Sequence, residues 1–283
     1  MLHEANIFDL AAKAAPGGLE AGGAKGSALA ALLRNCACVY HLAAQAGVRA
    51  SWGTSFEVYS RNNVLATQQL LEACVAAAAP KVIYASSSSV YGDQDELPLR
   101  EDMVPRPRSP YGVTKLAGEH LCGLYHANHG LNTVSLRFFT VYGPRQRPDM
   151  AFHKFIKAML DGREIVIYGD GTQTRDFTCV DDIVEGLVLA QKAPAGSVMN
   201  LGGGNRVSLG EAIATLGEIT GVEPVLSRQG VEAGDVRDTC ADVSRAAEAI
   251  GYTPTTRLKA GLAQEFAWLA DIGDLWTVSE LRR

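Results

Sequence analysis

The sequence lacks long hydrophobic runs and basic tracts. No apolar stretch reaches the roughly 18 to 20 residues that a helix needs to cross a bilayer. The opening residues, MLHEANIFDL, contain no basic segment followed by an apolar core. The 283 residues carry a formal net charge of -5. These absences exclude a membrane span and a secretory leader, argue against nucleic acid as a partner, and predict a cytoplasmic protein.

Cysteine is scarce and scattered. With 47% hydrophobic residues, the chain can bury a core without disulfides, so we expect reduced, packed cysteines. Cys36 and Cys38 are spaced like metal ligands, but no second Cys/His pair follows at zinc spacing, so no metal is predicted. His41 and His153 are expected to be structural. The cysteines are Cys36, Cys38, Cys74, Cys122, Cys179 and Cys240.

Two segments about 20 residues apart suggest a catalytic centre. Residues 81–85 (KVIYA) read as a buried strand that ends in a hydroxyl cluster, YASSSSVYG. The second segment, SPYGVTK, places Tyr111 and Lys115 four residues apart on one face of a helix. A fixed ammonium beside a phenol favours the phenolate. We therefore expect a lowered pKa for Tyr111, which would let it act as a general base.

Tyr-x-x-x-Lys alone is a weak signal. The alternative interpretation is a surface helix whose tyrosine packs and whose lysine is solvated, with residues 86–89 as a polar loop. The serine run, however, follows an apolar strand directly instead of lying among turn residues. This context favours the catalytic interpretation.

Strand and helix patterns alternate along the first half, which predicts an α/β fold with a Rossmann-like doubly wound parallel sheet. The expected strands are 36–44, 81–88 and 133–140, and the expected helices are 62–78 and 110–128. The right-handed crossover rule places Ala43, Ser87 and Thr140 along one edge of this sheet. After Gly143 we expect a smaller C-terminal α/β lobe, with helices near 150–161, 208–220, 242–250 and 257–271 and strands near 164–168, 197–201 and 223–227.

Several motifs in order resemble the extended short-chain dehydrogenase/reductase family, in its nucleotide-sugar epimerase and dehydratase branch. They are HLAAQAGVR (41–49), RNNVLATQQLLEA (61–73), YASSSSVYG (84–92), SPYGVTK (109–115), LRFFTVYGPRQRPDMAFHKF (136–155), YGDGTQTRDFTCVDDIVEG (168–186), NLGGG (200–204) and GDVRDTCAD (234–242). The resemblance implies a catalytic, NAD-binding domain over residues 1–143 and a nucleotide-sugar-binding lobe over 144–283.

The resemblance also implies the chemistry. Tyr111 takes the proton of the sugar 4-hydroxyl while NAD accepts the hydride from C4, Ser87 binds the same oxygen, and Lys115 holds the nicotinamide ribose. The 4-keto sugar then turns over and receives the hydride on its other face. The implied cofactor contacts are Leu42, Ala43, Ala44, Asn63, Tyr111, Lys115, Phe138 and Val141.

The branch follows from Ser88 and Ser89, which stand where dehydratases carry Asp-Glu. Hydroxyls are poor acids, so they favour simple 4-epimerisation of a UDP-sugar. The implied substrate contacts are Ser88, Ser89 and Thr140 at the sugar, Arg147 at a C6 carboxylate, Tyr168 at the base, Arg175 at the diphosphate and Asp235 at the ribose. Many relatives have Arg three residues before Asp235, and this chain has Glu232.

The motifs are most similar to those of UDP-glucuronate 4-epimerases, which predicts conversion of UDP-glucuronate to UDP-galacturonate. UDP-glucose, or its N-acetylated analogue, is the alternative substrate. Arg147 has an alternative too, as a solvated loop arginine, because Arg145 lies two residues away and either side chain could point inward. The family often forms homodimers by packing helices equivalent to 62–78 and 110–128, so we expect a homodimer.

Family members begin with a strand and a G-x-x-G-x-x-G turn that holds the dinucleotide pyrophosphate. The Gly-rich run at 16–26, PGGLEAGGAKG, has Glu20 where that repeat needs glycine, and the preceding AAKAA does not read as a buried strand. We interpret it as a flexible loop. The sheet is therefore predicted to be incomplete at its N-terminus, with weak NAD binding and little activity. A truncated, non-catalytic nucleotide-sugar-binding protein is a further alternative.

Overall fold

The computed structural model describes residues 7–12, 27–204, 206–230, 232 and 234–272. The Gly-rich run at 16–26 lies outside these ranges. A four-stranded parallel sheet, in the order β1-β2-β3-β7, organises the larger part of the molecule. Its strands are β1 (Val39–His41), β2 (Val82–Ser87), β3 (Thr133–Phe138) and β7 (Ser197–Leu201). This sheet confirms the predicted α/β fold class.

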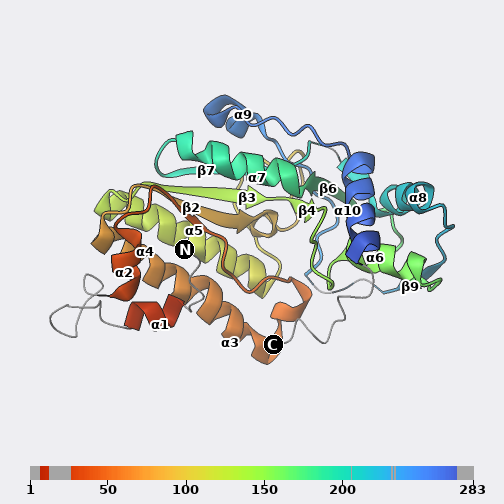
Figure 1. Cartoon of the computed structure of the whole chain (residues 1–283), viewed down its shortest axis with the longest axis horizontal. Helices are drawn as coiled ribbons and strands as arrows, with labels where there is room; N and C mark the ends of the chain where they lie inside the picture. Colours follow the sequence, from red (N-terminus) through yellow and green to blue (C-terminus); the bar gives the residue numbers. More distant parts are fainter. Residues whose placement is uncertain (1–6, 13–26, 205, 231, 233, 273–283) are drawn as a thin grey trace.

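Helices cover both faces of this sheet (Figure 1). On one face, α4 (Ala66–Ala77) and α5 (Pro110–His129) pack against Val82 and Tyr84. On the other face, α7 (Val180–Leu189) and α9 (Ser244–Ile250) share a core with Ile83. Side chains alternate along a strand, so neighbouring residues of β2 supply the two cores. Shorter helices α1 (Ile7–Ala12) and α2 (Ala28–Leu33) pack on the side of α4.

The start of α5 is fixed by its sequence. The Ser109 hydroxyl accepts a hydrogen bond from the Gly112 N–H at 3.0 Å, and Pro110 occupies the first helical position. Gly118 brings the helix close to the sheet, since a Cβ at that position would lie 2.2 Å from the Tyr84 hydroxyl oxygen. Tyr111 is thereby held at the end of β2.

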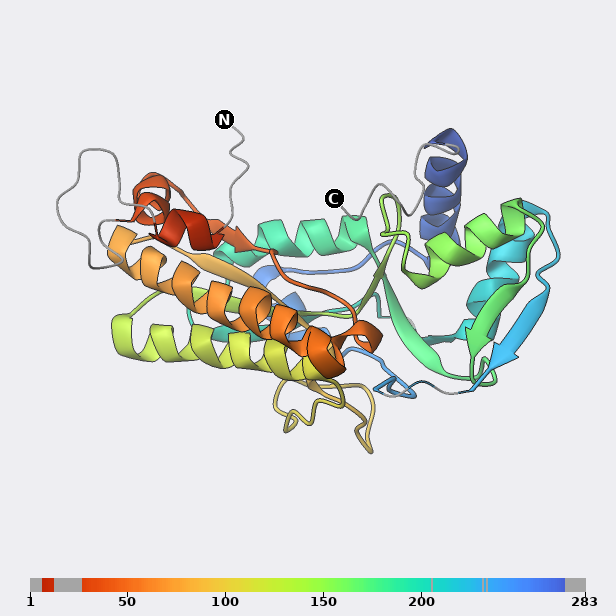
Figure 2. The same ribbon diagram turned by 90° about the horizontal axis from the view of Figure 1, so that it is seen from below.

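The smaller lobe lies at one end of the molecule (Figure 2). Its strands are β4 (Thr140–Tyr142), β6 (Thr174–Cys179) and β8 (Arg206–Ser208) in one sheet, and β5 (Ile165–Tyr168) and β9 (Leu226–Gln229) in another. They share a core with α6 (Ala151–Leu160), α8 (Leu209–Thr220) and α10 (Leu258–Ile272). No helix in the described ranges is long and apolar enough to cross a membrane.

Three predicted assignments were wrong. The strand at 197–201 belongs to the large sheet, where β7 pairs with β3, and the helix at 242–250 packs there as α9. The expected strand 133–140 is two strands, because β3 ends at Phe138 and β4 then pairs with β6. Thr140 therefore begins β4 instead of ending a strand of the large sheet. The domain boundary at Gly143 stays a prediction. The content of the two domains is revised, because β7 and α9 belong to the larger one.

Candidate active site

Ser87 and Tyr111 meet at the carboxyl end of β2. The Ser87 hydroxyl accepts a hydrogen bond from the Ser89 N–H at 3.1 Å, which caps a 3₁₀ turn over Ser88–Val90. Ser87 also hydrogen-bonds the Tyr111 phenol. The Tyr111 N–H is held in turn by the Ser51 hydroxyl at 3.1 Å. The structure therefore brings together the hydroxyl and the phenol that the sequence predicted to act on one oxygen.

Lys115 lies one turn further along α5 and is buried. Its Nζ donates to the Ala85 carbonyl at 2.8 Å and lies 5.9 Å from the centre of the Tyr111 ring. Burial lowers the pKa of Lys115 to about 8. The ammonium is thus anchored to β2 and lies near the phenol ring.

The expected lowering of the Tyr111 pKa was wrong. Burial raises the pKa of this phenol, and the Ser87 hydrogen bond and the charge of Arg147 only partly oppose that effect. The prediction considered the ammonium of Lys115 but not the loss of water around the ring. The positive charge that acts on Tyr111 here comes from Arg147.

We expect the stability of the protein to depend on pH through Lys115. Its folded pKa of about 8 lies below the ordinary lysine value of 10.5, so folding releases a proton between these pH values and stability rises with pH there. Lys115→Met removes this dependence. Relative to the parent, the variant should lose about 2 kcal/mol between pH 7 and pH 9.5, measured by urea unfolding. A difference that does not change with pH would contradict the buried-ammonium assignment.

Asn63 holds the loop that follows β1. It lies in a π-helical segment, Ser60–Leu65, between α3 (Phe56–Tyr59) and α4. Its amide nitrogen donates to the Gln45 carbonyl and the Thr114 hydroxyl, each at 2.9 Å, and its amide oxygen accepts from the Gln45 N–H at 2.7 Å. A cofactor contact was predicted for Asn63, and the structure gives it internal partners that tie this loop to α5.

The other predicted cofactor residues frame the same edge of the sheet. Leu42 and Ala43 are exposed and Ala44 is half-buried just beyond β1, while Phe138 pairs with Ser87 across β2 and β3. Val141 follows in β4 and is half-buried. Parallel sheets bind ligands at the carboxyl ends of their strands, so the edge that carries Ser87, Tyr111 and Lys115 is where the nicotinamide end of a dinucleotide would be held. The segment considered for its pyrophosphate, 16–26, is not among the described residues.

Arg147 lies in the loop between β4 and α6. Gln146 anchors this loop by donating to the Val141 carbonyl at 3.2 Å and accepting from the His153 N–H at 3.0 Å. The Arg147 guanidinium donates two hydrogen bonds to the Asp149 carboxylate, at 2.9 and 2.8 Å. Its charge lowers the pKa of Tyr111, so it lies at the catalytic end of the molecule. The Arg147 side chain is 47% exposed, and neighbouring Arg145 is exposed as well.

The residues predicted to bind the nucleotide also gather in one place. Arg175 Nη1 donates to the Arg237 carbonyl at 2.8 Å, and Asp235 acts on its charge. Arg49, which had no predicted role, joins them from the large domain. Its Nη2 lies 2.7 Å from the Asp235 Oδ2, and its guanidinium carbon lies 4.0 Å from the centre of the Tyr168 ring.

Three remaining substrate predictions fall on accessible positions. Ser88 and Ser89 are half-buried in the turn that Ser87 caps, and Thr140 is half-buried at the start of β4. The Glu232 side chain is exposed, and its backbone carbonyl accepts from the Asp235 N–H at 3.3 Å. The sequence departure at Glu232 thus leaves the backbone support of Asp235 intact.

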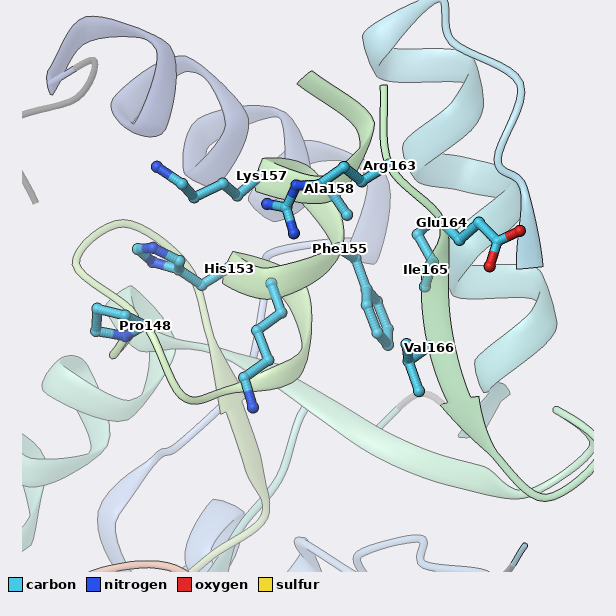
Figure 3. A pocket seen from close by; sticks show the side chains of 10 residues that line it. Pro148, His153, Phe155, Lys157, Ala158, Arg163, Glu164, Ile165 and Val166 are labelled. Atoms are coloured by element: carbon cyan, nitrogen blue, oxygen red, sulfur yellow. The ribbon is translucent and has the colours of Figure 1, made fainter. Parts of the chain in front are cut away.

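A cavity of about 450 Å³ lies between α6 and the start of β5. Figure 3 shows the residues that line it, which are mostly apolar, with several basic side chains. The first of them in the sequence, Pro148, follows Arg147 directly. Val166 lines the cavity and shares a strand face with Tyr168, because side chains alternate along β5. The residues around the cavity are Pro148, His153, Lys154, Phe155, Lys157, Ala158, Arg163, Glu164, Ile165 and Val166.

A buried ion pair lies beneath the catalytic residues. Arg137 of β3 donates two hydrogen bonds to the Glu119 carboxylate of α5, at 2.9 and 2.8 Å. Glu119 also accepts from the hydroxyl of Ser86, next to Ser87. The pair fixes α5 relative to β2 and β3. Sequence reasoning missed it, although Glu119 lies one turn after Lys115 and on the same face of the helix.

His41 and the buried cysteines take part in packing. His41 is buried beside Thr67, with 2.8 Å between Nε2 and the hydroxyl, and burial lowers its pKa to about 4. All six cysteines are free, and burial raises the pKa of Cys74 and Cys122 to about 12. No cluster of metal-ligating side chains occurs in the described portion of the chain.

Comparison with known proteins matches residues 12–202 to the NAD dependent epimerase/dehydratase family. A UDP-glucuronate 4-epimerase of Thermodesulfobacterium geofontis is 40% identical over 81% of this chain and 71% of its own length. An uncharacterized UDP-glucose epimerase of Bacillus subtilis is 44% identical over 86% of this chain and 78% of its own.

Solved structures agree with these relatives. The UDP-glucuronic acid 4-epimerase of Bacillus cereus, in complex with UDP-glucuronic acid and NAD, has a TM-score of 0.85 and 45% identity over 89% of this chain and 81% of that chain. MoeE5, in complex with UDP-glucose and NAD, has a TM-score of 0.83 and 47% identity over 88% of this chain and 84% of that chain.

Proposed function

Because this chain belongs to the NAD dependent epimerase/dehydratase family, we propose that it inverts C4 of a UDP-sugar and converts UDP-glucuronate to UDP-galacturonate. The observation that carries the proposal is that Ser87 hydrogen-bonds the Tyr111 phenol and that the charge of Arg147 lowers the Tyr111 pKa. An oxygen acid-base pair next to a guanidinium suits a sugar that carries a 4-hydroxyl and a C6 carboxylate. Similar proteins bind UDP-glucuronic acid and NAD.

The chain's own residues supply acid-base chemistry. Tyr111 takes the proton of the 4-hydroxyl, and Ser87 hydrogen-bonds the same oxygen and keeps it in line with the phenol. NAD, when bound, would supply the hydride acceptor and donor for C4, on either face of the sugar. Tyr111 then gives the proton back. Lys115, anchored at Ala85, is placed to hold the nicotinamide ribose.

Ser88 and Ser89 support epimerisation over dehydration. Both lie beside Ser87 in the same 3₁₀ turn, at the positions where an elimination reaction would need an added acid and base. Hydroxyl groups can hold a sugar while it turns over, but they exchange protons poorly near neutral pH. The site therefore suits a reaction in which Tyr111 handles the only proton.

UDP-glucose is the second candidate substrate. Asp149 already satisfies the Arg147 fork with its own carboxylate, so a sugar with a neutral C6 could bind without disturbing this pair. MoeE5, which is similar in structure, was captured with UDP-glucose as well as with UDP-glucuronic acid. The two candidates differ in one group, the C6 carboxylate.

Arg147→Gln separates the two substrates. A carboxylate that loses its charged partner costs at least about 2 kcal/mol, so kcat/KM for UDP-glucuronate should fall on the order of 30-fold or more. UDP-glucose should lose clearly less, because its C6 hydroxyl carries no charge and only the effect of Arg147 on the Tyr111 pKa is removed. Steady-state assays with both substrates measure the difference.

Arg145→Gln is the matched control for this variant. It removes a guanidinium two residues away and should leave both substrates at parent rates. Equal losses for both substrates in Arg147→Gln would reject the carboxylate role and favour UDP-glucose. A selective loss in Arg145→Gln would move that role to Arg145.

We further propose a cytoplasmic homodimer. The outward side of α5 and of the helix before it carries exposed apolar side chains at Leu65, Val113 and Leu124, which a second copy could cover. Six free thiols suit a reducing compartment. A non-catalytic nucleotide-sugar-binding protein remains the alternative from another functional class, and it predicts UDP-sugar binding without turnover.

A further inference from the structure

Arg49 links two parts of the molecule that are far apart in sequence. It begins a 3₁₀ turn, Arg49–Ser51, that follows the loop after β1 in the large domain. Its side chain contacts the smaller lobe, where it pairs with Asp235 at 2.7 Å and lies over the Tyr168 ring at 4.0 Å. Tyr168 and Asp235 are the residues that the family resemblance assigns to the base and the ribose of the proposed UDP-sugar substrate. In this structure the Arg49 guanidinium lies where the base would stack on Tyr168 and where the ribose would reach Asp235.

The charges around this cluster do not balance. Arg49 and Arg175 both face Asp235, and Arg206 and Arg237 lie 3.2 and 3.8 Å from the Asp238 carboxylate. Arg237 also acts on the Asp170 carboxylate, so four guanidinium groups share three carboxylates. Burial lowers the pKa of Arg175, and the charge of Arg49 acts in the same direction. A dianion placed here would relieve this excess.

We propose that Arg49 is the second arm of a diphosphate clamp, opposite Arg175, and that nucleotide binding moves it from Tyr168 and Asp235 to the phosphates. A base that stacks on Tyr168 needs the space about 3.5 to 4 Å above the ring, which the guanidinium now fills. A displaced guanidinium binds phosphate as a bidentate fork. The clamp rests on the proposed function, and with the diphosphate bound Arg49 joins the catalytic domain to the substrate lobe through the phosphates instead of through Asp235 and Tyr168.

Arg49→Gln tests the clamp by ligand truncation. Calorimetric titration of the whole chain with UDP and with uridine measures the two halves of the contact separately. We expect UDP affinity to fall on the order of 10- to 100-fold, because a charge-assisted hydrogen bond to phosphate is lost. Uridine affinity should stay within about twofold of the parent or increase, since Tyr168 and Asp235 are uncovered.

Arg100→Gln is the matched control. Arg100 is also paired with an aspartate, and its side chain is 47% exposed compared with 46% for Arg49. It should leave both titrations unchanged. Arg49→Lys keeps the charge without the fork, so it should bind UDP with intermediate affinity and a stronger dependence on salt.

Two outcomes would overturn the clamp alone. One is an Arg49→Gln variant that binds UDP as the parent does. The other is an equal loss of UDP and uridine affinity, which would place Arg49 at the base or in the fold. A parent protein that binds neither ligand would overturn the proposed function together with the clamp.

Discussion

Tyr111→Phe is expected to lower the kcat of epimerisation by on the order of 10² to 10⁴, the usual effect of removing a general base. UDP affinity should stay nearly unchanged, because the nucleotide contacts lie in the smaller lobe around Tyr168 and Arg175. The ring itself remains, so its packing beside Tyr59, with 6.2 Å between ring centres, should persist. Turnover assays and UDP titration measure the two effects separately.

Tyr40→Phe is the control for this experiment. Tyr40 also uses its hydroxyl, which accepts a hydrogen bond from Gln191 at 2.5 Å, but it lies in β1 away from Ser87. The variant should keep the parent rate. A Tyr111→Phe protein that turns over at the parent rate would show that another group moves the proton.

Glu119→Ala is expected to lower the free energy of unfolding by about 3 to 5 kcal/mol, because it leaves the Arg137 guanidinium buried without a partner charge. Both side chains of this pair are 5% exposed. Arg137 Nη1 already has no hydrogen-bond partner among the described residues, and the neighbouring Tyr91 ring, 4.7 Å from the guanidinium carbon, carries no charge to replace Glu119. Urea unfolding measures the loss.

A double variant separates charge from shape. Glu119→Leu together with Arg137→Met removes both charges and restores apolar volume, and it should recover most of the stability lost in Glu119→Ala. A double variant as unstable as the single one would indicate that packing, not the uncompensated charge, determines the loss.

The proximity of the candidate catalytic residues could be predicted because their signals are local. Four-residue spacing put Tyr111 and Lys115 on one helix face, and a serine run after an apolar strand located Ser87. The structure places all three at one sheet edge. The protonation behaviour could not be read in the same way, since burial raises the Tyr111 pKa and burial depends on the whole fold.

Contacts between segments far apart in the sequence were the main features that could not be predicted from it. Nothing in the residues around Arg49 indicates that this side chain reaches Asp235, because the contact spans 186 positions. The strand at 197–201 was assigned to the wrong sheet for a similar reason. Its residue pattern predicts a strand but not which strand it pairs with. Only the fold shows that it pairs with β3.

Asn63 shows an intermediate case. The sequence drew attention to it through its motif, but the π-helical turn that aims its amide at Gln45 and Thr114 leaves no signature in hydrophobic periodicity. The predicted direct contact with the cofactor remains untested. The structure adds a role that the sequence did not suggest, which is to hold the loop after β1 against α5.

The central claim is that Ser87, Tyr111 and Lys115 carry out oxidation and reduction at C4 of a UDP-sugar. Because the sequence predicts weak NAD binding and little activity, the most direct measurement is a long incubation of concentrated protein with excess NAD+ and UDP-glucuronate deuterated at C4, with the product analysed by NMR and mass spectrometry. We predict UDP-galacturonate that retains deuterium at C4, because the hydride leaves and returns at the same carbon. Binding of UDP-glucuronate without any UDP-galacturonate, or a product that has exchanged its C4 deuterium with solvent, would contradict the account.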